Sequence, residues 1–383
     1  MKRFVRYITF NMNRIFDFFR NLLMSCYAIF RLKPANLIFL IRHKELYKHK
    51  SYFPEFEENR KTSRKIFWEQ VGNVLKYNSP DLFYFPYGLD VKPKEECKKY
   101  LHYNYFNKHR DGLNFSSKVN CTCILRDKML FNIFADGIGI KTPTNVLYAS
   151  NGKLYDFQSK QEVSAKDLSY YGKHTLFCKL VDGECGKGIF KLEFDGVDYY
   201  IDGKKYNEEG AYRQLTSGRY LAQEVVQQHP MMSSLHPQSV NSMRIVTVKS
   251  VKDGIIRIWP SMLRVGTGNS IVDNTSQGGV YAGIDFETCR LKKFGFYKPQ
   301  FGLKTERHPD SDIVFSDFTI PFLSEACEQA KYFHSMLPGL QSIGWDIAIG
   351  NDGPIFIEGN DNWEINGPQI CNGGMRDLMR EQM

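Results

Sequence analysis

Alternating apolar and polar positions near the end of the chain predict a β-hairpin. Apolar side chains dominate residues 345–349 and 355–357, and a Gly-Asn-Asp-Gly turn separates the two runs. Apolar runs joined by such a turn are typical of paired antiparallel strands. The hairpin would bring together three oxygen-bearing side chains, those of Asp346, Glu358 and Asn360.

Further strands and helices precede this hairpin. Helical spacing of apolar residues predicts one helix that opens at Arg126-Asp127-Lys128 and ends at Gly137 and Gly139, and another from Phe322 to Met336. Runs rich in β-branched and aromatic residues predict strands at 145–148, 175–180, 189–194, 220–226, 242–249 and 255–265. Because Gly, Asn or Pro turns join these strands, we expect an antiparallel α+β fold.

The first thirty residues carry a helical apolar stripe. Its members step by threes and fours, at Val5, Ile8, Met12, Ile15, Phe19, Leu22, Cys26 and Ile29. Four arginines fall on the opposite side, Arg3, Arg6, Arg14 and Arg20. Such a helix can lie in an anionic membrane interface, dock on its own protein or bind a partner helix, and the pattern leaves all three open.

Pattern changes along the chain suggest four parts. Residues 1–50 form a basic amphipathic helical segment, and residues 51–120 form a mainly helical accessory region broken by prolines. Two α+β parts follow, residues 121–222 with a glycine-rich loop and residues 223–383 with the hairpin.

Net charge is concentrated at the N-terminus. The chain has 51 Lys and Arg against 42 Asp and Glu, a formal charge of +9, and 42% of its residues are hydrophobic. The first fifty residues hold eleven of the basic and two of the acidic side chains, so the remainder is balanced. That balance gives no electrostatic reason to expect a nucleic-acid partner. An anionic membrane surface, met through residues 1–31, is the expected alternative.

Nine cysteines without a Cys-x-x-Cys pair favour reduced thiols. The N-terminal apolar run is interrupted by Asp17 and Arg20 and lacks a small-residue cleavage site, which argues against a secretory signal. No window of about 18 uncharged apolar residues predicts a spanning helix. We therefore expect a cytoplasmic protein, with the inner face of the membrane as an alternative location.

Two clusters carry candidate chemistry. The carboxylates and amide of the hairpin are hard oxygen ligands that suit Mg²⁺, which would take phosphate oxygens as further ligands. The loop between the strands at 175–180 and 189–194 contains Gly183, Gly186 and Gly188, so its N–H groups could approach phosphate oxygens. It matches neither a Walker loop nor a dinucleotide fingerprint, and a plain turn is the alternative.

The order of these parts resembles that of ATP-grasp enzymes. Lys128, Lys179, the glycine-rich loop, the Gln-Glu-Val-Val segment at 223–226, two arginines and the hairpin follow one another as they do there. More narrowly, residues 120–375 resemble the sugar-transfer-associated ATP-grasp family, relatives of α-L-glutamate ligases. The matching motifs are Asn241-Ser242-Met243-Arg244, Met262-Leu263-Arg264, Asp273-Asn274, Gly278-Gly279 and Glu358-Gly359-Asn360. This resemblance implies an α+β ATP-grasp fold, two subdomains that grip ATP, preceded by a mainly helical, basic N-terminal region.

The resemblance also implies a role for each residue. Lys128 and Lys179 would hold ATP phosphates under a flap made by Gly183, Gly186 and Gly188. Glu224 and the backbone of Val226 would meet the adenine, and Asp346, Glu358 and Asn360 would bind two Mg²⁺ ions, with Mn²⁺ as an alternative. Arg244, Arg264 and Asn274 would act on the transferred phosphoryl group and the substrate. Judged singly, Arg244 and Arg264 could instead be structural ion-pair partners, and Lys128 a solvated lysine.

The implied reaction is amide formation driven by ATP. A carboxylate on a sugar or glycan would be phosphorylated, and an amine would attack the acyl phosphate. Family context places this in capsule or cell-surface polysaccharide biosynthesis or modification. Two rival functions remain, an ATP-dependent sugar kinase and a non-catalytic nucleotide-binding scaffold for glycosyltransferases.

Overall fold

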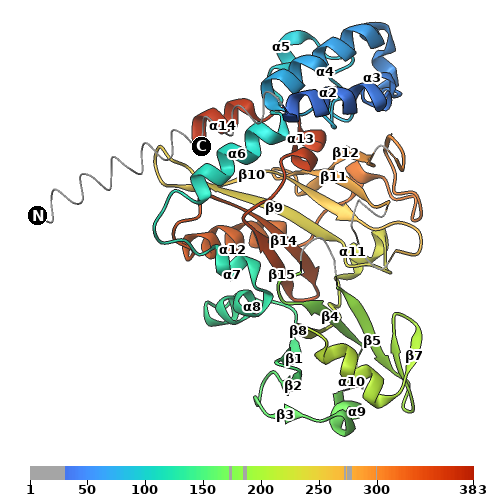
Figure 1. The fold of residues 1–383 in the computed structure, drawn as a ribbon, viewed down its shortest axis with the longest axis vertical. Coiled ribbons are helices and arrows are strands. Elements are labelled where there is room, and N and C mark those ends of the chain that lie inside the picture. The colour runs from blue at the N-terminus through green and yellow to red at the C-terminus, as the bar shows by residue number, and fades with distance from the viewer. Residues whose placement is uncertain (1–30, 172–174, 184–187, 271–272, 274–277, 299) are drawn as a thin grey trace, which may run out of the picture. The chain divides into compact units, whose positions relative to one another are not determined.

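The computed structural model describes residues 31–383 except 172–174, 184–187, 271–272, 274–277 and 299. The helix expected in the first thirty residues therefore lies outside the described part. The chain forms two compact units (Figure 1). The first contains the described residues up to Lys108 together with Gly373–Arg376, and the second contains the rest.

The first unit is helical, and it includes most of the mainly helical accessory region expected at residues 51–120. Its helices and 3-10 turn are α2 Lys33–Arg42, α3 Glu45–Lys48, η2 Pro54–Asn59, α4 Ser63–Tyr77 and α5 Lys94–Cys97. The longest, α4, begins at Thr62, whose side chain accepts from the Lys65 N–H, and ends at Asn78 in a left-handed conformation. Helix α6, Tyr103–Asn114, includes the boundary between the units.

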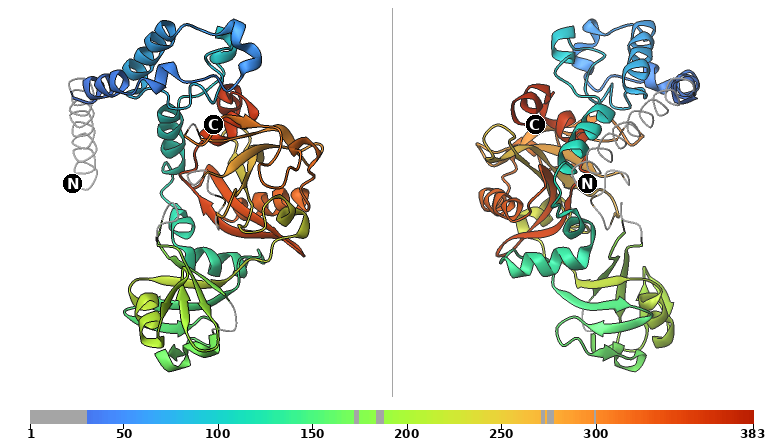
Figure 2. Two further views of the ribbon diagram at one scale, coloured as in Figure 1. Left: turned by 90° about the vertical axis from the view of Figure 1, so that its right-hand side faces the viewer. Right: turned by 60° about the vertical axis from the view of Figure 1, so that its left-hand side comes forward.

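The second unit contains two antiparallel sheets that lie in separate lobes, sheet A in green and sheet B from yellow to red (Figure 2). Sheet A has eight strands in the order β3-β2-β1-β8-β4-β5-β6-β7. Their bounds are β1 Asn145–Ser150, β2 Lys153–Asp156, β3 Glu162–Val163, β4 Leu176–Leu180, β5 Phe190–Phe194, β6 Tyr199–Ile201, β7 Lys204–Tyr206 and β8 Tyr220–Glu224. The helical elements between these strands are η3 Ala165–Asp167, α9 Leu168–Tyr171 and α10 Glu208–Thr216.

Sheet B has seven strands in the order β13-β12-β11-β10-β9-β14-β15. Their bounds are β9 Ser242–Lys249, β10 Ile256–Val265, β11 Val280–Asp285, β12 Arg290–Phe296, β13 Lys304–Thr305, β14 Ser342–Gly350 and β15 Gly353–Asn360. The remaining helical elements are α7 Thr122–Arg126, α8 Lys128–Gly137, α11 Pro230–Leu235, η5 Phe315–Asp317, α12 Leu323–Ser335, α13 Asn366–Asn372 and α14 Arg376–Gln382. The α+β expectation is confirmed.

Each sheet has its own core. Helix α10 closes the core of sheet A, where Ala211 and Leu215 are fully buried against the strands. Helix α12 covers one face of sheet B, and its Phe333 lies between Phe131 of α8 and Trp345 of β14, with ring centroids 5.4 and 4.6 Å away. Helix α8 is therefore anchored to the core of sheet B. No helix among the described residues has the length and apolarity needed to cross a bilayer.

Candidate active site

A row of polar side chains crosses four strands of sheet B. Glu358 on β15 is paired with Asp346 on β14, and Asp346 is paired with Arg244 on β9. Arg264 on β10 is paired with Ser242, two residues before Arg244. Because side chains alternate along a strand, these residues share the face opposite the one covered by α12. The structure thus brings together the predicted hairpin carboxylates and both predicted arginines.

Asp346 is the centre of this row. Its carboxylate accepts hydrogen bonds from Arg244 Nε at 2.5 Å and Nη2 at 3.2 Å, and it lies 3.0 Å from Arg264 Nη2. Burial alone would raise the pKa of Asp346, but the two guanidinium groups outweigh it and hold the pKa well below its usual range. Asp346 is therefore an anion fixed between two arginines.

Glu358 is hydrogen-bonded to Asp346. Burial, the charge of Asp346 and a hydrogen bond to it all raise the pKa of Glu358. On the same strand, Asn360 Nδ2 lies 3.4 Å from Glu358 Oε1 and 3.3 Å from the Gly344 carbonyl. A carboxylate has about four acceptor positions, and the arginines occupy three of those on Asp346. The remaining position on Asp346 accepts the hydrogen bond from Glu358, and a cation held by the two carboxylates would replace that hydrogen bond.

This donor set fits a divalent ion. Two carboxylates and an amide oxygen suit Mg²⁺, which completes its shell with phosphate oxygens and water. Among the described residues there is no group of three or more His, Cys, Asp and Glu side chains that could hold a metal.

Two lysines lie near the row, Lys128 at the start of α8 and Lys179 on β4 of sheet A. Lys128 begins α8, where Asp127 caps the helix by accepting from the N–H groups of Met129 and Leu130. The Lys128 N–H donates to the Val181 carbonyl at 3.0 Å, and its ammonium donates to the Gly183 carbonyl at 2.5 Å. Helix α8 therefore connects the core of sheet B to the glycine-rich loop of sheet A.

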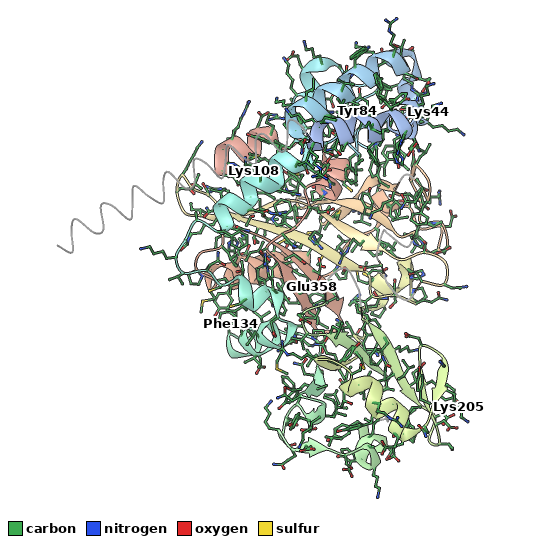
Figure 3. All side chains as sticks on the ribbon, viewed as in Figure 1. Lys44, Tyr84, Lys108, Phe134, Lys205 and Glu358 are labelled. Carbon is green, nitrogen blue, oxygen red and sulfur yellow. The ribbon has the colours of Figure 1, made fainter. Side chains whose placement is uncertain are left out.

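Lys179 on β4 of sheet A interacts electrostatically with the two carboxylates of sheet B. Burial lowers the pKa of Lys179 to about 8, against the attraction of Glu358 and Asp346 and with the repulsion of Lys128. Glu358 lies at the end of sheet B that is nearest to sheet A (Figure 3). Two lysines and two carboxylates thus converge where the sheets meet.

The glycine-rich loop between β4 and β5 is partly described. Gly183 and Gly188 flank residues 184–187, which include the predicted flap residue Gly186 and lie outside the described part. Gly188 has φ +68°, and a Cβ there would lie 2.4 Å from Leu180 Cδ1. Both constraints require glycine at this position.

Two partners of Arg264 were not assigned a role from the sequence. Ser242 Oγ accepts from Arg264 Nη2 at 2.7 Å and donates to Asp273 Oδ2 at 2.5 Å. Asp273 Oδ2 also lies 3.6 Å from Arg264 Nε. Both residues belong to the matching motifs, and strand alternation places Ser242 on the face of Arg244. Periodicity does not predict the contact between Asp273 and Ser242, because a long stretch of chain separates them. Its predicted neighbour Asn274 lies outside the described residues.

The expected adenine contacts lie at the end of β8. Glu224 closes this strand, and its N–H donates to the Thr144 carbonyl at 2.9 Å, with half-buried Val226 two residues beyond. Gln228 and His229 follow this strand. Gln228 donates to the Ser239 carbonyl at 2.8 Å and His229 caps α11, so both are used within the chain.

Trp363, just past the hairpin, belongs to the core. Its side chain is 1% exposed, and its Nε1 donates to Ser342 Oγ at 3.1 Å. Burial at this level rules out stacking of this ring on a sugar in this conformation.

Solved structures with a similar arrangement are remote. An L-amino acid ligase from Bacillus licheniformis is 13% identical, with a TM-score of 0.38, over 73% of this chain and 52% of that chain. An N5-carboxyaminoimidazole ribonucleotide synthetase bound to ADP is 10% identical, with a TM-score of 0.37, over 68% and 52%. The Staphylococcus aureus N5-carboxyaminoimidazole synthetase bound to ADP is 10% identical, with a TM-score of 0.37, over 66% and 50%.

This chain spans about half the length of those structures, and at such identities and TM-scores the likeness carries no functional information. No protein with a curated description matches the sequence. The family described as sugar-transfer associated ATP-grasp matches residues 113–380, more than half of the chain. The fold and the motifs agree with that match, and the chain belongs to the sugar-transfer-associated ATP-grasp family.

Proposed function

We propose that this protein is an ATP- and Mg²⁺-dependent carboxylate–amine ligase that works through an acyl phosphate. The carboxylate belongs to a sugar or glycan, and the product belongs to capsule or cell-surface polysaccharide biosynthesis or modification. The observation that supports this most is the convergence of Lys128 and Lys179 with Asp346 and Glu358 where the two sheets meet.

The lysines and the carboxylates contact different parts of the bound Mg²⁺ and ATP. Lys128 and Lys179 hold phosphate oxygens, and the loop with Gly183 and Gly188 covers them with backbone N–H groups. Asp346, Glu358 and Asn360 would hold Mg²⁺, as two ions, and Mn²⁺ could replace it. When bound, the metal supplies positive charge to the γ-phosphoryl group during transfer.

The arginines bind oxygens of the substrate carboxylate and of the phosphoryl group as it is transferred. One of its oxygens forms a bond to the γ-phosphorus while the bond to the β,γ-bridging oxygen breaks, and ADP leaves. Arg244 uses Nε and Nη2 on Asp346, which leaves Nη1 for the phosphoryl or acyl oxygens. The amine nitrogen then bonds to the acyl carbon, orthophosphate leaves, and the nitrogen loses its proton.

Product analysis tests this reaction. ADP release would be screened with pairs of uronates and amines, and each active pair repeated with ¹⁸O in the carboxylate. A ligase transfers one ¹⁸O to orthophosphate and forms an amide, because the carboxylate oxygen leaves with phosphorus. A kinase would keep phosphate on the product, and a scaffold would release no ADP, so either result would contradict the proposal.

The metal assignment has its own test. We expect Glu358→Ala and Asn360→Ala to abolish ADP release while circular dichroism and the unfolding transition stay cooperative. Asp352→Ala, in the exposed turn of the same hairpin, is the matched control and keeps normal turnover. Normal ADP production by either site variant would remove these residues from the metal site.

A further inference from the structure

The positive charge of this chain belongs to its first 108 residues. Residues 1–30 carry five Lys and Arg against one acidic residue, and residues 31–108 carry sixteen against nine. Residues 109–383 carry thirty against thirty-two. The unit that contains α2–α5 is therefore basic, whereas the unit with the candidate active site is slightly acidic.

Helix α4 has two contrasting faces. Ile66, Gln70 and Val74 are buried. The opposite face, called here the α4 outer face, consists of the exposed residues Arg64, Lys65, Trp68, Gly72, Leu75 and Lys76. Trp68 is 61% exposed and Leu75 is 52% exposed. Large apolar side chains thus lie between basic ones at both ends of the helix.

No acidic residue interrupts this face. The helix has one carboxylate, Glu69, and it is turned toward Lys61, whose Nζ lies 3.0 Å from Glu69 Oε2, and toward the Tyr84 hydroxyl. Trp68 rests edge-on against Phe67 with ring centroids 5.6 Å apart, and Phe67 packs in the same way on Tyr47 of α3. The exposed indole is therefore held by its neighbours.

Helix α2 adds similar surface beside α4 (Figure 1). Ile38 and Ile41, one turn apart, are 50% and 57% exposed. Arg42 and Lys44 follow them and are exposed as well. Exposed apolar side chains next to uncompensated positive charge recur on both helices of this unit.

We propose that the α4 outer face binds an anionic phospholipid surface. Trp68 and Leu75 would enter the headgroup region, where an amphipathic ring and a short apolar chain are favoured, while Arg64, Lys65 and Lys76 attract anionic headgroups. A second copy of the chain would bring two faces of the same charge together. A nucleic-acid backbone would make no use of the exposed leucine and isoleucines.

Trp68 provides a direct reporter. The other three tryptophans, Trp259, Trp345 and Trp363, are at most 1% exposed, so changes in emission on binding come from Trp68. The full chain would be titrated with phosphatidylcholine vesicles with and without phosphatidylglycerol. With anionic vesicles alone, we expect a blue shift, loss of acrylamide quenching and co-sedimentation that weakens with added salt.

Two double variants and a control locate the contact. We expect Arg64→Glu/Lys65→Glu to lower vesicle partitioning by about tenfold or more. Acidic residues are favourable in the first turn of a helix, so this variant keeps α4 folded. Trp68→Ser/Leu75→Ser should also weaken partitioning. Lys166→Glu/Lys204→Glu, which reverses two exposed lysines of the second unit, should bind like the unaltered chain.

Three results would overturn the proposal. The full chain could fail to sediment with anionic vesicles. It could sediment while Trp68 emission stays unchanged and both α4 variants bind normally, which would assign lipid binding to residues 1–30. Trp68 could also be shielded from acrylamide in the free protein, which would mean that another part of the chain or a second copy covers the face.

Discussion

At the scale of single residues, the site combines one fixed anion with one carboxylate that resists ionisation. Asp346 is held as an anion by Arg244 and Arg264, whereas burial and the charge of Asp346 raise the pKa of Glu358. A buried ion pair contributes little net stability, and unpaired carboxylates in contact cost stability. We infer that this arrangement stores repulsion that a bound cation relieves.

The raised pKa of Glu358 has a defined effect on stability. A carboxyl whose folded pKa is raised contributes stability that is present below its unfolded pKa and is lost as pH rises through the folded value. We therefore expect Glu358→Gln to be more stable than the unaltered protein at pH 8, with the difference disappearing in acid. Urea unfolding over a pH series measures this, and ADP release by the variant should fall at least a hundredfold. Lower stability of the variant at pH 8 would contradict the assignment.

Lys179 predicts how nucleotide affinity varies with pH. Its ammonium form binds phosphate, and its pKa is lowered to about 8. Affinity for ATP should therefore be highest below pH 8 and fall about tenfold for each unit above it, with proton uptake on binding. Calorimetry in buffers of different ionisation enthalpy measures both quantities. Lys179→Met should bind weakly with no such dependence, and a flat profile for the unaltered protein would refute this role.

At the scale of elements, sequence periodicity located the strands that carry the site. The predicted strand at 242–249 coincides with β9, and the hairpin at 345–360 lies within β14 and β15. Helix α13 was not predicted, because its Asn366-Gly367-Pro368 start has the composition of a turn. Strand β12 was missed because its lysines obscure the apolar alternation. These elements depend on tertiary packing that local patterns do not encode.

In the candidate site, too, some contacts follow from local sequence patterns and others depend on tertiary packing. Asp346 and Glu358 lie on neighbouring strands joined by a short turn, so their proximity followed from alternation. The Asp273–Ser242 contact joins residues that are 31 positions apart, and the periodicity of the sequence does not predict it.

Helix α12 supports the hairpin through one aromatic side chain. Phe333 is fully buried among Phe131, Trp345 and Phe356. We expect Phe333→Ala to lower the free energy of unfolding by about 3–5 kcal/mol, because the cavity lies in a packed core. Tyr332→Ala, the neighbouring residue at 47% exposure, is the control and should change it by less than about 0.5 kcal/mol. Equal effects in denaturant titrations would place the support of the hairpin elsewhere.

At the scale of the whole molecule, the proposed function depends on residues of two sheets in one unit that approach each other at the candidate site. Sheet A contributes Lys179 and the glycine-rich loop, sheet B contributes the row from Arg264 to Glu358, and α8 connects them through Lys128. The basic unit with α2–α5 carries a different surface chemistry. A glycan ligase that works at a membrane would need the unit with the two sheets for the reaction and the basic unit for binding to the membrane.

Isothermal titration of a non-hydrolysable ATP analogue tests the central claim most directly. With Mg²⁺ present, we predict saturable binding at one site per chain, weakened at least tenfold by EDTA and by Glu358→Gln. Absence of binding at any Mg²⁺ concentration, or equal affinity with and without EDTA, would contradict the assignment of this site to a metal-bound triphosphate.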